Sequence, residues 1–109
     1  MVTRLAGTTV DVETPLSEGE VGQTLRVAIR AGDILIATER PRGLSARNQL
    51  PGTIASLSRE GTFVRATVDI GVPVAVHVTP GSVEQLSLRQ GSNVWLVVKT
   101  HSCRPVSTV

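Results

Sequence analysis

Aromatic residues are scarce in this 109-residue chain, which has one Trp, one Phe and no Tyr. Domains that bind single-stranded nucleic acid stack bases on several aromatic side chains, each contributing about 1–3 kcal/mol per base. Phe63 and Trp95 are too few for such a surface. The net charge of +2, from 11 Lys and Arg against 9 Asp and Glu, is also too weak to indicate a polyanionic partner. We therefore expect no nucleic-acid partner.

The chain also has few cysteines and no long apolar run. Its one cysteine, Cys103, cannot form an internal disulfide, which argues against a disulfide-stapled secreted scaffold. The longest apolar run, residues 94–98, is far shorter than the ~20 residues of a membrane-spanning helix. Residues 1–6 are followed by Gly7, Thr8 and Thr9 rather than by the apolar segment of a secretory signal. These features predict a cytoplasmic protein.

Enzyme and metal motifs are missing as well. The chain has no phosphate loop of the Gly-x-x-x-x-Gly-Lys-Ser/Thr type, no Gly-x-Ser-x-Gly elbow and no His-Glu-x-x-His pair. His77 and His101 have no second ligand at metal-binding spacing. Cys103 has only His101 nearby as a base, so a small buried hydrophobic side chain is the preferred interpretation. The sequence predicts no enzyme activity, no metal ion and no organic cofactor.

β-Branched residues are abundant instead, with 17 Val, 12 Thr and 5 Ile. Such side chains lose χ1 freedom in helices and pack well on a pleated sheet. Apolar and polar residues alternate along most of the chain, as in half-buried strands. Short strands with glycines at the corners predict a small all-β barrel, closed or nearly closed.

The alternation also gives the expected boundaries. It predicts strands at residues 10–12, 25–30, 34–37, 53–57, 63–70, 72–78 and 94–99. Polar or glycine-containing connections are expected at residues 17–22, 31–33, 38–43 and 58–61. We divide the chain into residues 1–42, with N-terminal strands and a linker, and residues 43–109, with the barrel core. Residues 104–109 are expected to be frayed.

One short helix interrupts the strand pattern. Thr79 is a suitable N-cap, Pro80 suits the first helical position, and Gly91 leaves room for one or two turns. The predicted core consists of alternating apolar positions on the later strands, namely Val64, Val68, Val74, Val76, Val94, Leu96 and Val98.

Three segments carry groups that suit a small oxyanion. In residues 43–52, turn N–H groups can point into one concavity, and Arg47 can add charge-assisted hydrogen bonds. The helix start has the hydroxyls of Thr79 and Ser82 beside free N–H groups. At residues 99–102 a lysine is followed by hydroxyl residues. Singly, these segments are also typical of a turn, a helix cap and a strand end.

Together the segments 43–52, 78–83 and 94–103 resemble the MOP-type oxyanion-binding domain, also called the TOBE domain. The similarity is closest to the version at the C-terminus of the ATP-binding subunit of molybdate ABC transporters. Its most distinctive element is the Ser-Ala-Arg-Asn sequence at residues 45–48, followed by Thr-x-x-Ser at residues 79–82 and by Lys99. The resemblance is strong over residues 43–103, extends to residues 24–42 and is loose over residues 1–23.

This resemblance implies an OB-like barrel that pairs with another copy and holds molybdate or tungstate where two units meet. It implies two ligand groups from different units, with further hydroxyls nearby. These are Ser45, Ala46, Arg47 and Asn48 from one unit, Lys99 and Thr100 from the other, and Thr79 and Ser82 close by. Small stand-alone molybdate-binding proteins of this family usually have a short tail of small residues after the lysine. Here Thr-His-Ser-Cys-Arg follows at residues 100–104, which favours the transporter branch.

Three functions follow from the resemblance. The first is a regulatory domain that senses cytoplasmic molybdate or tungstate for an ABC transporter, with the ATPase domain and permease as partners at the inner face of the membrane. The second is a stand-alone molybdate store or buffer. The third is an interaction domain whose anion site has been lost. Self-association into a dimer or higher oligomer is expected, with Trp95 or Phe63 at the contact, and the alternative is a monomer whose partner is the ATPase.

Overall fold

The structure, a computed structural model, describes residues 2–4, 11–13 and 25–108. Its strands are β1 (Val2–Arg4), β2 (Asp11–Glu13), β3 (Leu25–Ala28), β4 (Leu35–Ala37), β5 (Asn48–Glu60), β6 (Phe63–Asp69), β7 (Pro73–Val78), β8 (Asn93–Val98) and β9 (Arg104–Thr108). The helices are α1 (Pro80–Gln85) and two 3₁₀ turns, η1 (Ala31–Asp33) and η2 (Thr100–Ser102). Within this part of the chain, a membrane-spanning helix is ruled out by length and apolarity.

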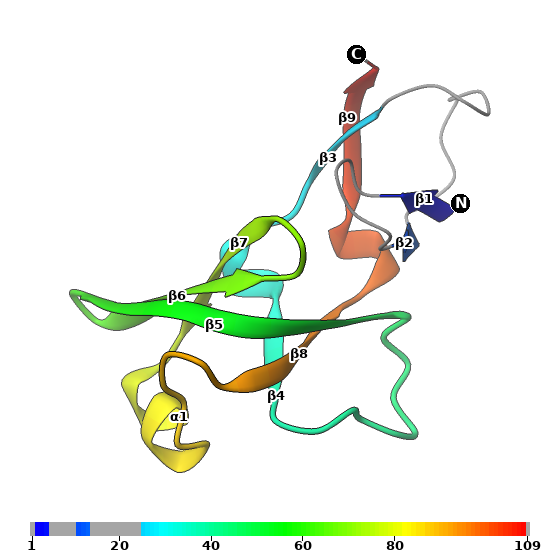
Figure 1. Ribbon diagram of the computed structural model, residues 1–109. Helices are drawn as coiled ribbons and strands as arrows, with labels where there is room; N and C mark the ends of the chain where they lie inside the picture. The colour runs from blue at the N-terminus through cyan, green and yellow to red at the C-terminus, as the bar shows by residue number, and fades with distance from the viewer. Residues whose placement is uncertain (1, 5–10, 14–24, 109) are drawn as a thin grey trace.

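The main sheet is antiparallel and has the strand order β4-β8-β5-β6-β7. The long strand β5 makes this possible, because its first half pairs with β8 and its second half with β6. η1 and β4 lie beside β7, so the two ends of the sheet approach each other. In Figure 1, β5 and β6 cross the middle of the molecule, with α1 below them and with β3 and β9 extending above. The all-β, OB-like barrel with one short α-helix is confirmed.

The two central hairpin strands follow the predicted alternation. On β6 the buried side chains are Val64, Ala66 and Val68, while residues between them face outward or are half-buried. On β7 the fully buried residue is Val76, and Val74 is half-buried against the same core. The other predicted core residues, Val94, Leu96 and Val98 of β8, are all buried. The core prediction is confirmed, with Val74 at its margin.

The helix also begins where the sequence predicts. The hydroxyl of Thr79 accepts a hydrogen bond from the Ser82 N–H at 3.0 Å, and Pro80 is the first helical residue. The helix ends after six residues, which is between one and two turns, consistent with the space before Gly91. A proline at this position costs no hydrogen bond because the first N–H groups of a helix have no partner within it.

Some boundaries differ from the predictions. β5 begins at Asn48 and ends at Glu60, so the predicted turn at residues 58–61 moves to Gly61 and Thr62. Residues 104–108, expected to be frayed, form β9 because their backbone groups find hydrogen-bond partners on β3. The terminal position gave no sign of this pairing, because the partner strand lies about 80 residues earlier.

Other expectations concern the N-terminal region. The strand expected at residues 10–12 overlaps β2, although Val10 lies outside the described residues, as does the loop expected at residues 17–22. The division at residues 42 and 43 stays a prediction. β4 precedes that division yet pairs with β8 of the later part, and Ile34 beside it is 3% exposed in the main core.

Candidate oxyanion site

Two of the three predicted segments meet in one pocket of about 300 Å³, which we call the Lys99 pocket. Ser45 and Ala46 line it from the loop before β5, and Lys99 lines it from the residue after β8. The remaining lining residues come from η1, β4, β8, η2 and the same loop, and they are Gly32, Asp33, Leu35, Leu44, Val97 and Ser102. The structure thus brings residues 54 positions apart to one hollow of a single chain, whereas the family resemblance implied that they would approach the anion from different units.

Strand pairing explains this convergence. β5 and β8 are antiparallel, and Asn48 at the start of β5 is paired with Val98 at the end of β8. Residues 45–47 just before β5 therefore lie beside Lys99 just after β8. Gly43 adopts a φ of +65°, which a glycine tolerates without the steric cost of a Cβ, as the chain turns toward the site. The register of one strand pair places the two segments together.

The polar groups of this pocket are available for a ligand. Within the described residues, the Lys99 ammonium and the hydroxyls of Ser45 and Ser102 have neither a hydrogen bond nor an ion pair. Ser45 and Lys99 are exposed, while Ala46 is 8% exposed and forms part of the floor with the buried Val97. A cation and two hydroxyls over an apolar floor can donate hydrogen bonds to an oxyanion.

Five of the eight predicted site residues do not line this pocket, and three of these five, Arg47, Asn48 and Thr100, belong to the same two segments as the residues that do. Asn48 is buried, and its side-chain Nδ2 donates a hydrogen bond to the Sγ of Cys103 at 3.3 Å. Arg47 is exposed, and Thr100 is half-buried in η2. Burial raises the pKa of the Cys103 thiol, and the hydrogen bond from Asn48 acts in the opposite direction. Asn48 therefore packs behind the pocket rather than opening into it.

Thr79 and Ser82 line a neighbouring pocket of about 210 Å³. The Thr79 hydroxyl accepts a hydrogen bond from the Ser82 N–H and also donates one to the Ser82 Oγ at 2.9 Å. The two side chains are therefore hydrogen-bonded to each other. Gly32 and Leu35 line both this pocket and the one that contains Lys99. The third predicted segment is thus adjacent to the other two, on the far side of η1 and β4.

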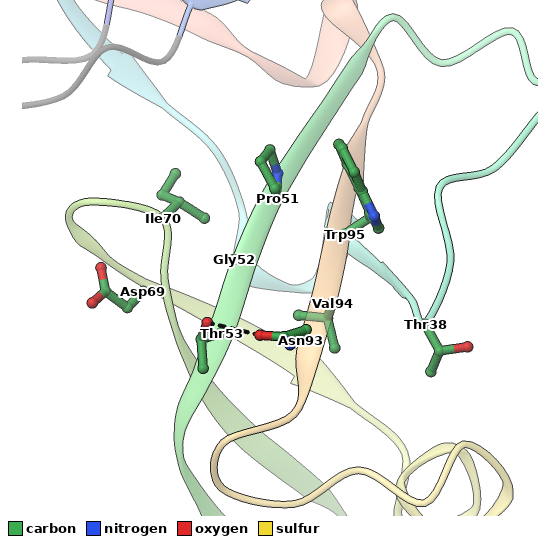
Figure 2. Close-up of a pocket in the computed structure, with 9 residues that line it drawn as sticks. All are labelled: Thr38, Pro51, Gly52, Thr53, Asp69, Ile70, Asn93, Val94 and Trp95. Atoms are coloured by element: carbon green, nitrogen blue, oxygen red, sulfur yellow. Dashed lines mark hydrogen bonds between the residues drawn. The ribbon is translucent and has the colours of Figure 1, made fainter.

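A different hollow, of about 400 Å³, lies beside Trp95 and contains none of the predicted site residues (Figure 2). Its polar side chains include Thr53, whose hydroxyl donates to the Asn93 Oδ1 at 3.3 Å. The one charged residue that lines it is Asp69, a carboxylate that would repel an anion. The guanidinium of Arg40 lies over the Trp95 ring, 5.3 Å from the centroid. This hollow has the larger volume, but its carboxylate makes it less suitable for an anion than the pocket that contains Lys99, Ser45 and Ser102.

The described residues contain no group of three or more His, Cys, Asp and Glu side chains that is suited to a metal ion. Instead, His77 packs against Phe63 with ring centroids 4.2 Å apart. His101 is exposed in η2, two residues from the buried Cys103. The interpretation of Cys103 as a small buried side chain is confirmed.

Sequence reasoning missed several residues that line the Lys99 pocket. Asp33 and Leu35 belong to η1 and β4, which reach the site only because β4 pairs with β8. Leu44 precedes the Ser-Ala-Arg-Asn sequence but has no distinctive chemistry. Ser102 belongs to residues 99–102, which the sequence identifies as a lysine followed by hydroxyl residues, so its place in the site could have been predicted.

Comparison with known proteins identifies relatives of this chain. The "Molybdenum import ATP-binding protein ModC" of Mesorhizobium japonicum is 44% identical over 103 residues, which cover 93% of this chain and 28% of the relative. ModC of Rhizobium meliloti is 47% identical over 92 residues, which cover 82% of this chain and 26% of the relative. This chain thus spans little more than a quarter of the length of these relatives.

A solved structure is similar in fold. It is the cytoplasmic molybdate-binding protein ModG with molybdate bound, which matches with a TM-score of 0.66 and 26% identity. The match covers 72% of this chain and 58% of ModG. The sequence pattern of the TOBE domain matches residues 44–105, more than half of the chain and including both segments of the Lys99 pocket. This chain belongs to the TOBE domain family.

Proposed function

We propose that this domain binds molybdate or tungstate in the Lys99 pocket and reports the oxyanion to a molybdate ABC transporter. The observation that carries the proposal is the meeting of Ser45, Ala46 and Lys99 in one pocket with unpaired donor groups among the described residues. Tetrahedral oxyanions need several donors and a positive charge. The similarity to ModG and to ModC supports this choice of ligand.

The transporter setting rests on the relatives. In the ModC proteins the matching region is about a quarter of an ATP-binding subunit. We propose that this domain acts with such an ATPase and its permease at the cytoplasmic face of the membrane. This chain has no phosphate loop, so we expect it to hydrolyse no ATP by itself. Its part would be regulation rather than catalysis.

The proposed contacts fall into two groups. Ser45, the backbone N–H of Ala46 and Lys99 face the anion directly from the pocket. Arg47, Asn48 and Thr100 flank or support these residues. Thr79 and Ser82 are proposed to meet the anion from the adjacent pocket, either in the same chain or across a contact with a second copy.

A second copy is the proposed partner of the isolated domain. Leu35 and Leu44 are 60% and 44% exposed and both line the Lys99 pocket, so apolar surface surrounds the charged group. Covering these side chains would stabilise a dimer through the hydrophobic effect. Trp95 and Phe63, the anchors expected from the sequence, are half-buried and already contact Arg40 and His77. Sedimentation at high micromolar concentration, with and without molybdate, tests this association.

Calorimetric titration tests the proposed ligand. Molybdate and tungstate are expected to bind, and sulfate is expected to compete weakly or not at all. Absence of heat with both metal oxyanions, confirmed by equilibrium dialysis, would contradict the proposal and favour a purely structural interaction domain. A storage protein is the second candidate, because ModG, similar in fold, is a molybdate-binding protein. Molybdate-dependent changes in the ATPase rate of a transporter that contains this domain would favour the sensor over the store.

A further inference from the structure

The Lys99 pocket contains one positive and one negative side chain. Of its nine lining residues only Lys99 and Asp33 carry a formal charge, so the charges in the lining cancel. Arg47, the one cation of the Ser-Ala-Arg-Asn sequence, is not among the lining residues. A pocket for a dianion is expected to have an excess of positive charge, and the carboxylate of Asp33 opposes this.

The fold holds Asp33 at this position. Asp33 is the last residue of η1, and its backbone N–H donates to the Arg30 carbonyl oxygen at 2.9 Å. The next residue, Ile34, is 3% exposed and anchors the chain in the main core. The Asp33 side chain is exposed, and within the described residues it has no ion pair that would neutralise it. No partner among the described residues therefore offsets the charge of Asp33 at the lining of the pocket.

We infer that Asp33 is an affinity-setting residue, whose negative charge weakens the binding of a dianion in this pocket. This inference rests on the proposed function and concerns the same site. A negative side chain beside a dianion raises the free energy of the bound state without affecting the free anion. A sensor benefits from such a residue, because its affinity must match the concentration that it reports rather than reach a maximum.

The substitution Asp33→Asn tests the inference, since it removes the charge and keeps the size. We expect molybdate to bind about fivefold more tightly to Asp33→Asn than to the parent, as measured by calorimetry at low salt. Asp69→Asn is the matched control, because it makes the same chemical change at the separate hollow beside Trp95 (Figure 2) and leaves an oxygen to accept from the Gly71 N–H. Molybdate affinity of Asp69→Asn is expected to equal that of the parent.

Ionic strength separates charge repulsion from a change in structure. Between about 0.01 M and about 1 M salt the Debye length falls from about 30 to about 3 Å. The affinity ratio of Asp33→Asn to the parent should therefore approach one as salt is added, whereas a structural effect would persist. Equal or weaker binding by Asp33→Asn at low salt would overturn the inference while the proposed function stands. If neither the parent nor Asp33→Asn binds molybdate, the proposed function is wrong and the inference falls with it.

Discussion

The side-chain amide of Asn48 donates a hydrogen bond to the thiol sulfur of Cys103, and both residues are buried. Asn48 is the last residue of the Ser-Ala-Arg-Asn sequence, and Cys103 directly follows the 3₁₀ turn that begins after Lys99. The bond therefore joins, across 55 positions of sequence, the two segments that form the Lys99 pocket. It lies behind the pocket and can fix the relative position of its two walls.

Removing this acceptor should lower the stability of the domain. In Cys103→Ala the Asn48 amide loses the sulfur in a buried site, which typically costs about 1–3 kcal/mol. Urea denaturation followed by circular dichroism measures the difference. Cys103→Ser retains an acceptor and is expected to lose less, and His101→Ala, an exposed neighbour, should change little. Equal stability of Cys103→Ala and the parent would show that the bond contributes nothing.

The same burial predicts a dependence of stability on pH. The pKa of the Cys103 thiol is raised above its ordinary value of 9.0 in the folded protein, so the unfolded chain releases this proton first as pH rises. The thiol's contribution is complete below that ordinary value and is lost progressively as pH rises toward the folded pKa. Urea midpoints measured from pH 7 to about pH 10 should therefore fall more steeply for the parent than for Cys103→Ser, which has no titrating group here. Parallel curves would contradict this prediction.

The sequence predicts the central barrel well where one face of a strand is buried. Val64, Val68 and Val76 alternate with outward residues, so the pattern itself reports the buried face. Val97 was missed because it lies on the other face of β8, where residues of the loop before β5 line the same pocket and Val97 is only 2% exposed. Alternation cannot identify a residue that is buried by a distant loop.

The candidate site is predictable in part. Ser45, Ala46 and Lys99 were identified from the family resemblance, and the structure places them in one pocket. The position of Asn48 behind that pocket depends on its contact with Cys103, which follows from the pairing of β5 with β8. Asp33 reaches the site through the pairing of β4 with β8. Neither long-range pairing is encoded in a local motif.

Gly52 is required for close packing between β5 and β6. A Cβ at this position would lie 2.7 Å from the Val68 Cγ1 and 2.9 Å from the Asp69 carbonyl oxygen. Because the carbonyl belongs to the backbone, the strands must separate, and we expect Gly52→Ala to lose about 1–3 kcal/mol of stability. Gly81→Ala is the control, since the nearest atom to its Cβ would be the Thr79 Oγ1 at 3.9 Å and alanine favours the helix. Denaturation curves of the two variants should shift in opposite directions.

Thr79 has a structural role that must be separated from any role in binding. Thr79→Ala removes the hydroxyl that caps α1 and is expected to cost about 0.5–2 kcal/mol, whereas Thr79→Ser keeps the cap. If Thr79 also contacts the anion, Thr79→Ala will weaken molybdate binding under conditions where it remains fully folded, and Thr79→Ser will not. Unchanged affinity of folded Thr79→Ala would limit the residue to capping.

Lys99 is the residue on which the proposed site depends most. It is the only cation that lines the pocket and the only lysine in the chain, and within the described residues it has no ion pair. A charge-assisted hydrogen bond contributes about 1.5–3 kcal/mol, so Lys99→Ala should weaken molybdate binding at least about tenfold while the fold is retained.

Two matched variants make the Lys99 measurement specific. Lys99→Arg keeps the positive charge and is expected to bind more tightly than Lys99→Ala, while Arg89→Ala lowers the net charge equally at an exposed position outside the pocket. Arg89→Ala should bind molybdate as the parent does, because a solvent-exposed charge at a distance is screened by salt. Equal weakening by Lys99→Ala and Arg89→Ala would indicate a general charge effect, and parent-like binding by Lys99→Ala would show that the anion binds elsewhere.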